Sequence, residues 1–168
     1  MQRTRQEGRL THLIRAATPA NIPAMIELDQ QCATAAHWKE AQYRQAFQPE
    51  SAARLVLVAE SPAPPASHPD AGGEVVGFLV ARDLAGEWEL ENIVVAPTAR
   101  RQGLGKRLLK ALFSVARETG GGSVFLEVRE SNAAARTLYE RAGFKRTGGR
   151  KGYYTDPIED AVLYRLNL

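Results

Sequence analysis

An apolar strand, a glycine-containing turn and an amphipathic helix succeed one another between residues 88 and 118, and this succession constrains the fold most. The run 93–97 (IVVAP) is apolar and ends at a proline. From residue 104 to residue 116, leucine, alanine and valine recur at helical spacing, with basic residues off that stripe. A strand that turns directly into a helix with one apolar face indicates an α/β domain, in which helices cover a sheet.

The remaining hydrophobic pattern places further strands and helices around this unit. We expect seven strands, at residues 10–16, 55–59, 75–81, 88–95 and 124–128, from residue 144 onward, and at 159–168. We expect helices from Thr18-Pro19 onward, at 39–47, from Gly103 to the glycines at 120–122, and at 132–142. Residues 61–73, rich in proline and glycine, form a loop. The order predicts one mixed-sheet α/β domain over residues 10–168, after a flexible arm at 1–9.

Length and composition agree with one domain that needs no covalent cross-link. The chain has 168 residues, of which 44% are hydrophobic, and a core of that size is stable without disulfides. Its one cysteine, Cys32, excludes an internal disulfide and a zinc site built on several thiolates. No apolar run approaches the roughly 20 residues of a membrane helix, and no apolar signal region follows the N-terminus. We therefore expect a soluble, cytoplasmic protein without a metal and without membrane contact.

The net charge of +3 is unevenly distributed along the chain. Residues 96–117 contain six basic side chains and no acid, whereas residues 51–95 contain seven acids against two arginines. One compact domain with two such segments can hold an anion at one place and a cation at another. Solvated surface charge is the alternative for any one residue.

The basic segment begins with a turn that suits phosphate. Gly103 and Gly105 allow main-chain N–H groups to approach a ligand, and the start of the following helix favours an anion. Arg100, Arg101 and Lys106 add positive charge there. The segment fits neither the Rossmann fingerprint nor the Walker loop, because residue 108 is leucine and the lysine follows only Gly-x-Gly. The sequence therefore predicts a phosphate-binding turn of another kind.

This turn, Arg100-x-x-Gly103-x-Gly105 after an apolar strand, resembles the acyl-coenzyme-A pyrophosphate loop of the GNAT superfamily of N-acetyltransferases. The segments 126–134 (LEVRESNAA) and 138–144 (LYERAGF) extend the resemblance, which spans residues 10–168. The run 126–144, together with Tyr153-Tyr154 and 159–161, resembles the RimI-type branch, whose members acetylate the N-terminal alanine of a small-subunit ribosomal protein. The resemblance implies a mixed, mostly antiparallel sheet of about seven strands with flanking helices, and a splay between strands four and five.

The resemblance also implies acetyl-CoA as co-substrate and assigns residues to it. The backbone of the fourth strand would receive the acetyl-pantetheine arm and stabilise the charge that develops on the thioester oxygen. The loop would bind the pyrophosphate, and an asparagine would contact acetyl-CoA. These cofactor-binding positions are Ile93, Val94, Val95, Arg100, Arg101, Gln102, Gly103, Leu104, Gly105, Lys106 and Asn132.

Two further residues fit acid–base chemistry. Glu127 interrupts the apolar run 124–128, which is typical of an interior strand, and a carboxylate buried there favours its protonated form, which suits a base near neutrality. An outward-facing glutamate would give the same pattern. Tyr139 lies two helical turns after Asn132, and its alternative is a half-buried aromatic with its hydroxyl in water. The resemblance makes Glu127 the base for the amine and Tyr139 the acid for the departing thiolate.

The acceptor is less constrained by the sequence. An N-terminal amine has a pKa of about 7.7–8.0, against about 10.4 for lysine, so one moderate base suffices for it. Glu87, Glu89 and Glu91 alternate with apolar residues and share one face, which either receives a basic ribosomal-protein peptide or is only solvated. The resemblance places substrate against Trp38, Tyr153 and Tyr154. RimI-type enzymes usually have Pro-Trp where this chain has His37-Trp38, so the substrate entrance differs.

Three alternative functions remain open from the sequence. The first is acetylation of a lysine side chain or a small amine. The second is a non-catalytic acyl-CoA sensor, which retention of Glu127 and Tyr139 disfavours. The third is a nucleic-acid-binding module built on the basic segment, whose charges flank glycines at a helix start. We expect no direct contact with nucleic acid.

Overall fold

One seven-stranded sheet organises the chain in a computed structural model that describes residues 12–49, 53–62 and 72–168. The strand order is β1-β2-β3-β4-β5-β7-β6. The strands are β1 (Leu13–Ala16), β2 (Arg54–Glu60), β3 (Val75–Leu84), β4 (Glu87–Val95), β5 (Ser123–Arg129), β6 (Lys145–Thr155) and β7 (Ile158–Asn167). The expected arm at 1–9 and most of the loop at 61–73 lie outside the described residues.

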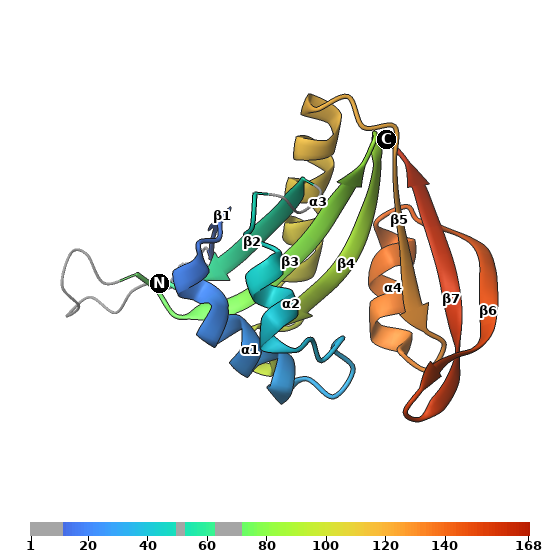
Figure 1. Cartoon of the computed structure of the whole chain (residues 1–168), viewed down its shortest axis with the longest axis horizontal. Helices are drawn as coiled ribbons and strands as arrows, with labels where there is room; N and C mark the ends of the chain where they lie inside the picture. The colour runs from blue at the N-terminus through green and yellow to red at the C-terminus, as the bar shows by residue number, and fades with distance from the viewer. Residues whose placement is uncertain (1–11, 50–52, 63–71) are drawn as a thin grey trace, which may run out of the picture.

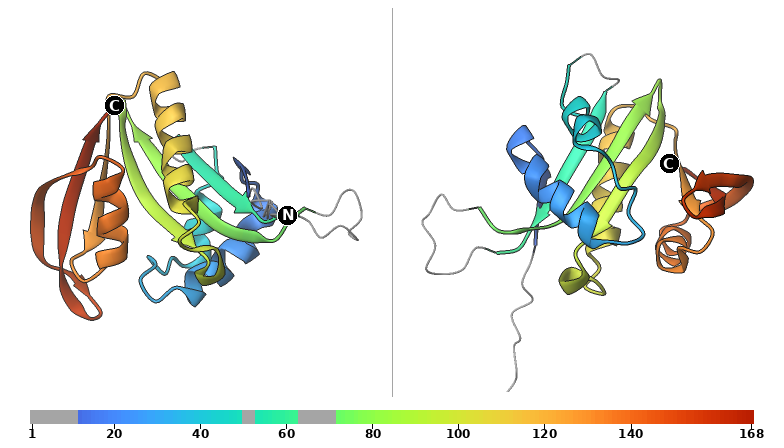
Figure 2. Two further views of the ribbon diagram at one scale, coloured as in Figure 1. Left: turned by 180° about the vertical axis from the view of Figure 1, so that it is seen from behind. Right: turned by 60° about the horizontal axis from the view of Figure 1, so that its bottom comes forward.

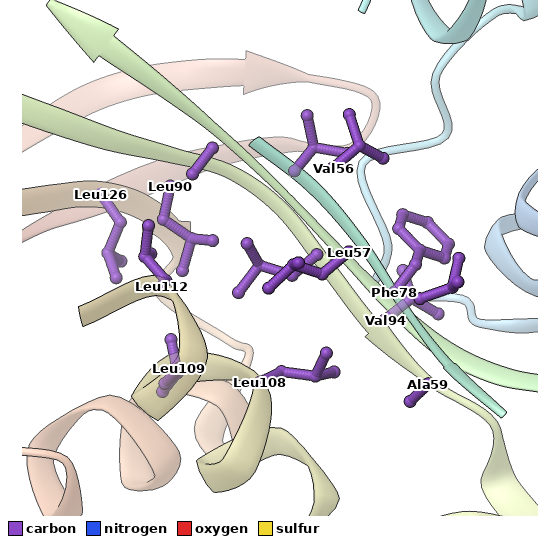
Figure 3. Packing of buried hydrophobic residues seen from close by; sticks show 14 of the residues in the cluster. Val56, Leu57, Ala59, Phe78, Leu90, Val94, Leu108, Leu109, Leu112 and Leu126 are labelled. Carbon is purple, nitrogen blue, oxygen red and sulfur yellow. The ribbon is translucent and has the colours of Figure 1, made fainter. Parts of the chain in front are cut away.

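Within the described residues, four α-helices cover the two faces of this sheet. They are α1 (Ile22–Gln31), α2 (Glu40–Gln45), α3 (Leu104–Glu118) and α4 (Ala133–Arg141). In Figure 1, α1 and α2 lie in front of the sheet, and the reverse view in Figure 2 brings α3 and α4 forward. The apolar stripe of α3 packs on the sheet, with Leu108, Leu109 and Leu112 completely buried (Figure 3). The predicted α/β layering is confirmed.

All neighbouring strands except the central pair are antiparallel. β4 and β5 are parallel, and their pairing is limited to Glu87–Glu89 against Ser123–Phe125. Beyond Glu89 the two strands diverge, and Figure 1 shows the sheet opening like a V away from the C-terminus. The predicted splay between strands four and five is confirmed, and we call this opening the splay.

The sequence pattern predicts most element boundaries to within a few residues. The turn between β3 and β4 places Ala85 and Gly86 at φ values of 56° and 91°, the conformation of a two-residue hairpin turn. At the N-terminal end, Thr18-Pro19 opens a short 3₁₀ turn, Pro19–Asn21, before α1 begins. Asn132 precedes α4 rather than starting it: its side-chain oxygen accepts from the N–H of Ala135 at 3.1 Å and caps the helix.

Candidate active site

Three elements meet at the open end of the splay. A Cβ atom added to Gly105, at the start of α3, would lie 3.0 Å from Leu138 of α4 and 3.9 Å from Val95 at the end of β4. Glycine is therefore required at this position for close packing rather than for its backbone angles. The contact places the turn before α3 directly beside the helix that carries Tyr139.

The turn at residues 100–104 presents main-chain donors. Arg101 has a φ of 60° and Gly103, the N-cap of α3, has a φ of 75°. A positive φ is strained for arginine, and such strain concentrates at functional sites. Among the described residues, the N–H groups of Arg101, Gln102 and Gly103 donate to no other main-chain group. Together with the first N–H groups of α3, which have no helical partner, they form an arrangement that fits a phosphate.

The side chains of this turn contribute unequally. The guanidinium of Arg100 donates to the carbonyl of Val95 at 3.1 Å and lies 3.4 Å from the Cys32 sulfur, so it is engaged by the protein itself. Leu104 is buried, and only its N–H can face a ligand. Lys106 and Arg101 are both exposed. The charge available to a ligand therefore comes from Arg101 and Lys106 rather than from all predicted positions.

The edge of β4 that faces the splay has no strand partner after Glu89 in the part of the chain that the structure describes. Val94 is buried, while the Ile93 and Val95 side chains are half-buried. β4 also contains one extra residue relative to β3, because Val80 pairs with Asn92 and the next residue, Ala81, pairs with Leu90. Such a bulge bends the strand. The predicted main-chain site at residues 93–95 thus lies on an unpaired edge.

Glu127 projects from the face of β5 opposite to α4. Its side chain is 19% exposed, and its Oε1 lies 3.0 Å from the guanidinium of Arg150 on β6. The interior strand expected from the apolar run is confirmed, since β5 lies between β4 and β7. The neighbours of Glu127 along the strand, Leu126 and Val128, are buried. Glu127 itself is half-buried and paired. The burial of this carboxylate is thus partial, because alternation along the strand turns the side chain toward a groove.

This groove has a volume of about 270 Å³ and is lined by both parts of the sheet. We call it the acceptor groove. Glu87 of β4 lines one wall, and residues of β5, β6 and β7 line the rest. The lining residues are Glu87, Phe125, Leu126, Glu127, Thr147, Arg150, Leu163, Tyr164 and Arg165.

The acidic residues of β4 share one face, as predicted, but arginines neutralise them. Glu87 is bonded to Arg165, Glu89 to Arg82, and Glu91 to Arg54 at 2.8 Å. These three carboxylates of β4 are therefore not free to bind a basic peptide. The partner arginines lie on β7, β3 and β2, and a count of charges does not show which carboxylate each arginine pairs with.

Tyr139 lies on the other face of β5, where burial raises the pKa of its phenol. Its ring is 5.8 Å from that of Phe144 and 6.2 Å from that of Tyr164. Glu127 and Tyr139 thus flank β5 from its two faces. A phenol whose pKa is raised stays protonated at neutral pH, so its O–H is present as a donor.

Tyr153 and Tyr154, near the end of β6, both interact electrostatically with Glu127. A hydrogen bond with the Glu127 carboxylate raises the pKa of Tyr153, and the charge of Glu89 acts in the same direction. Burial, followed by the charge of Glu127, raises the pKa of Tyr154. The guanidinium of Arg129 lies 4.2 Å from the centre of the Tyr154 ring. The structure therefore brings both predicted substrate-binding tyrosines to the electrostatic neighbourhood of the predicted base.

Trp38 lies in the α1–α2 connection, which a buried polar network holds in place. Asp29, almost completely buried in α1, accepts from the N–H of His37 at 3.3 Å. The Tyr43 hydroxyl accepts from the Asn92 side chain at 3.4 Å. Burial, followed by the charge of Asp29 and a hydrogen bond to it, raises the pKa of Tyr43. The Trp38 ring packs against that of Tyr43, with the ring centres 5.4 Å apart.

Sequence reasoning did not assign Asp29, Tyr43 or Asn92 to the site. One signal was available: Asp29 follows Ile22, Met25 and Ile26 at helical spacing, so its carboxylate falls on the apolar face of α1. A carboxylate there requires polar partners. Nothing in the pattern identified those partners, which come from α2 and β4.

The wider structure adds two observations. Among the described residues, no group of three or more histidine, cysteine, aspartate or glutamate side chains is arranged to hold a metal ion. No helix in that part of the chain is long and apolar enough to cross a membrane.

Comparison with known proteins decides the family. Residues 22–144, well over half of the chain, match the acetyltransferase (GNAT) family. The chain belongs to this family. The GNAT resemblance predicted from the loop and the two later segments is therefore confirmed.

Within the GNAT family, the chain is similar to enzymes that act on protein N-termini. It is 42% identical over 96 residues to the [ribosomal protein bS18]-alanine N-acetyltransferase of Escherichia coli K12, a match that covers 56% of this chain and 65% of that protein. It is 41% identical over 98 residues to the N-alpha-acetyltransferase RimI of Mycobacterium tuberculosis, covering 56% of this chain and 60% of that protein. In both comparisons, the matched region spans less than two thirds of the relative.

Solved GNAT structures extend the similarity to nearly the whole chain. The crystal structure of the ribosomal-protein-S18-alanine N-acetyltransferase from Escherichia coli has a TM-score of 0.73 and 30% identity, over 94% of each chain. The Arabidopsis thaliana NAA60 structure with acetyl-CoA has a TM-score of 0.80 at 17% identity, over 94% of this chain and 99% of that one. The latter similarity concerns the fold alone.

Proposed function

We propose that this protein transfers an acetyl group from acetyl-CoA to the N-terminal α-amine of a protein that begins with alanine. The observation that carries the proposal is the placement of Glu127 and Tyr139 on the two faces of β5, beside the splay. Similarity to enzymes named for ribosomal protein bS18 supports a small-subunit ribosomal protein as the substrate. Such a substrate is in the cytoplasm, and we propose the same location for this enzyme.

The donor would be held by the turn before α3 and by the edge of β4. The unpaired N–H groups at 101–103 and those that begin α3 would bind the pyrophosphate, with Arg101 and Lys106 adding charge. The amide nitrogen of Asn132 would remain available to the donor, because only its side-chain oxygen caps α4. Bound acetyl-CoA supplies the thioester whose carbon–sulfur bond breaks as the new carbon–nitrogen bond forms.

Glu127 and Tyr139 would then assist proton transfer from the acceptor nitrogen and to the departing sulfur. Glu127 takes a proton from the α-ammonium group, which leaves a neutral amine as the nucleophile. An N–H on the unpaired edge of β4 stabilises the negative charge that develops on the acetyl oxygen. Tyr139 protonates the departing sulfur, since a thiol with a pKa of about 8.5 leaves poorly as a thiolate. The nitrogen of the tetrahedral intermediate loses its second proton to solvent, and the phenol regains a proton from solvent. No covalent bond to Cys32 is needed, because that thiol is buried.

A peptide assay tests the proposal directly. Purified protein, acetyl-CoA and a peptide beginning Ala-Arg should give N-terminally acetylated product in mass spectrometry. A matched peptide with a blocked N-terminus and a free lysine should remain unmodified. Acetylation of that lysine instead would favour the side-chain reaction, and acetyl-CoA binding in calorimetry without any product would favour a sensor.

The Glu127→Gln substitution should lower kcat about 10²- to 10⁴-fold, the usual contribution of a general base. Glu130→Gln is the matched control, because Glu130 is an exposed glutamate three residues further along. It should leave kcat unchanged. Equal rates for the two variants would contradict the role of Glu127 as base.

A further inference from the structure

Arg150 holds the carboxylate that the acceptor amine must reach. Its guanidinium lies 3.0 Å from Oε1 of Glu127, and 54% of its side chain is exposed. An ammonium group that is to give a proton to Glu127 has to approach the same carboxylate. Two cations therefore compete for one carboxylate.

The attachment of Arg150 is weak enough to be exchanged. Within the described residues, its contacts are the ion pair with Glu127 and the ring of Tyr153, 5.2 Å from the guanidinium carbon. Regular pairing of β6 with β7 is interrupted between Arg150 and Tyr154. Gly152 has a φ of 58° in this irregular stretch. The guanidinium side of this ion pair is open to solvent, and an ion pair that solvent reaches contributes little stability, so replacement of its cation costs little.

The other charges of the acceptor groove do not compete for Glu127. Arg165 of β7 is bonded to Glu87 and donates to the Ser123 hydroxyl at 2.8 Å. Arg129, on β5 itself, lies 3.3 Å from Glu159. Arg150 is thus the one arginine of the described groove that pairs with the predicted base.

We propose that Arg150 is a specificity-determining residue: its guanidinium occupies Glu127 in the unloaded enzyme and is exchanged for the cationic amine of the acceptor. The inference rests on the proposed function. Exchange of one cation for another keeps the carboxylate paired throughout, which a neutral, blocked N-terminus cannot achieve. The site therefore selects free, positively charged amines.

The same exchange favours product release. During transfer, the acceptor nitrogen loses two protons and becomes a neutral amide: Glu127 takes the first before attack, and the second, lost from the tetrahedral intermediate, offsets the proton that Tyr139 gives to sulfur. Glu127 then loses its proton to water and is again a carboxylate. The amide has no charge to hold it, so Arg150 returns to Glu127 and the product leaves.

Steady-state kinetics with Arg150→Gln test the exchange. Removal of the competing cation should lower the KM for an Ala-Arg peptide about 3- to 10-fold, whereas Arg150→Lys, which retains a cation, should stay nearer to the wild type. Lys151→Gln is the matched control, because it removes an exposed positive charge next to Arg150, and its KM should not change. An unchanged or higher KM for Arg150→Gln would overturn the proposal.

A second measurement needs no transfer activity. Modification of arginines by phenylglyoxal, followed by peptide mass spectrometry, should be faster at Arg150 in Glu127→Gln than in Glu130→Gln, with the exposed Arg146 as internal reference. Equal reactivity in these two variants would overturn the inference on its own. Absence of transfer to any peptide by the wild-type enzyme would instead overturn the proposed function.

Discussion

The turn before α3 and the acceptor groove differ in how far their polar groups are already satisfied. Within the described chain, the turn offers N–H groups at Arg101–Gly103 without a main-chain partner. In the groove, by contrast, Glu87 and Glu127 are both paired with arginines. One region is built to receive an anion without rearrangement, and the other has to release an internal contact before a charged substrate can bind.

A charge pattern along the sequence therefore has different meanings in the two regions. In the basic segment, Arg101 and Lys106 remain accessible after folding, so the positive charge counted in the sequence is available to a ligand. The acids of β4, by contrast, are each paired with an arginine of β2, β3 or β7. We expect donor binding to respond to changes in the turn, and acceptor binding to respond to changes in ion pairing.

The largest effect should come from Tyr139, which belongs to neither region and acts between them. Tyr139→Phe removes the proton donor while the buried ring stays in place, so kcat should fall about 10²- to 10³-fold. The KM values for both substrates should change little, because neither region is altered. A large rise in either KM would show instead that Tyr139 contributes to binding.

The pH dependence of the rate tests the same group in a second way. Because burial raises the pKa of Tyr139 above the ordinary value of 10.0, the phenol remains protonated past pH 10. The wild-type kcat should therefore show no alkaline decline caused by this group between about pH 8 and 10. A falling limb in that range that disappears in Tyr139→Phe would contradict the assignment.

A change at Gly105 should disrupt the region that is already formed. Gly105→Val places methyl groups where a Cβ atom alone would be 3.0 Å from Leu138. Overpacking of this kind costs about 1–3 kcal/mol in the free energy of unfolding, and displacement of α4 from α3 should raise the KM for acetyl-CoA about tenfold or more. Gly122→Val, at a position with no described atom within 4 Å of an added Cβ, is the matched control. Equal KM values would show that the turn does not depend on this packing.

The smallest effect should come from Lys106, and it measures how much of donor binding depends on charge rather than on N–H groups. Lys106→Ala should raise the KM for acetyl-CoA only about 2- to 5-fold, with a smaller difference at high salt because screening weakens accessible charges. Lys110→Ala, one turn further along α3, should have no effect. A rise of about a hundredfold would mean that side-chain charge, not the main chain, dominates this region.

How much of the fold and of the candidate site the sequence predicts depends on how far apart in the sequence the interacting residues are. The strands, α3 and the splay follow from local periodicity and from the resemblance carried by Gly103, Gly105 and the segments around Glu127 and Tyr139. The hairpin at Ala85-Gly86 follows from turn chemistry. Local signals of this kind depend on residues that are close together in the sequence, so they can be recognised without knowledge of tertiary contacts.

The remaining features depend on partners that are far apart in the sequence. The pairing of Glu127 with Arg150, and of Glu87 with Arg165, joins residues on different strands. The network of Asp29, Tyr43 and Asn92 links two helices to β4. No periodicity specifies such contacts, because each arises only once the sheet has formed. For the same reason, the engagement of Arg100 by Val95 and Cys32 was not foreseen.

The splay has a consequence for the order of events in the proposed reaction. Because the described parts of β4 and β5 pair only at Glu87–Glu89, the opening beyond them passes through the sheet, with the turn before α3 and α4 on one face and the acceptor groove on the other. Donor and acceptor would approach from opposite faces and meet only at the thioester. Each could then enter or depart while the other stays bound, so the proposed transfer would take place in a ternary complex and would not require donor and acceptor to occupy one entrance in turn.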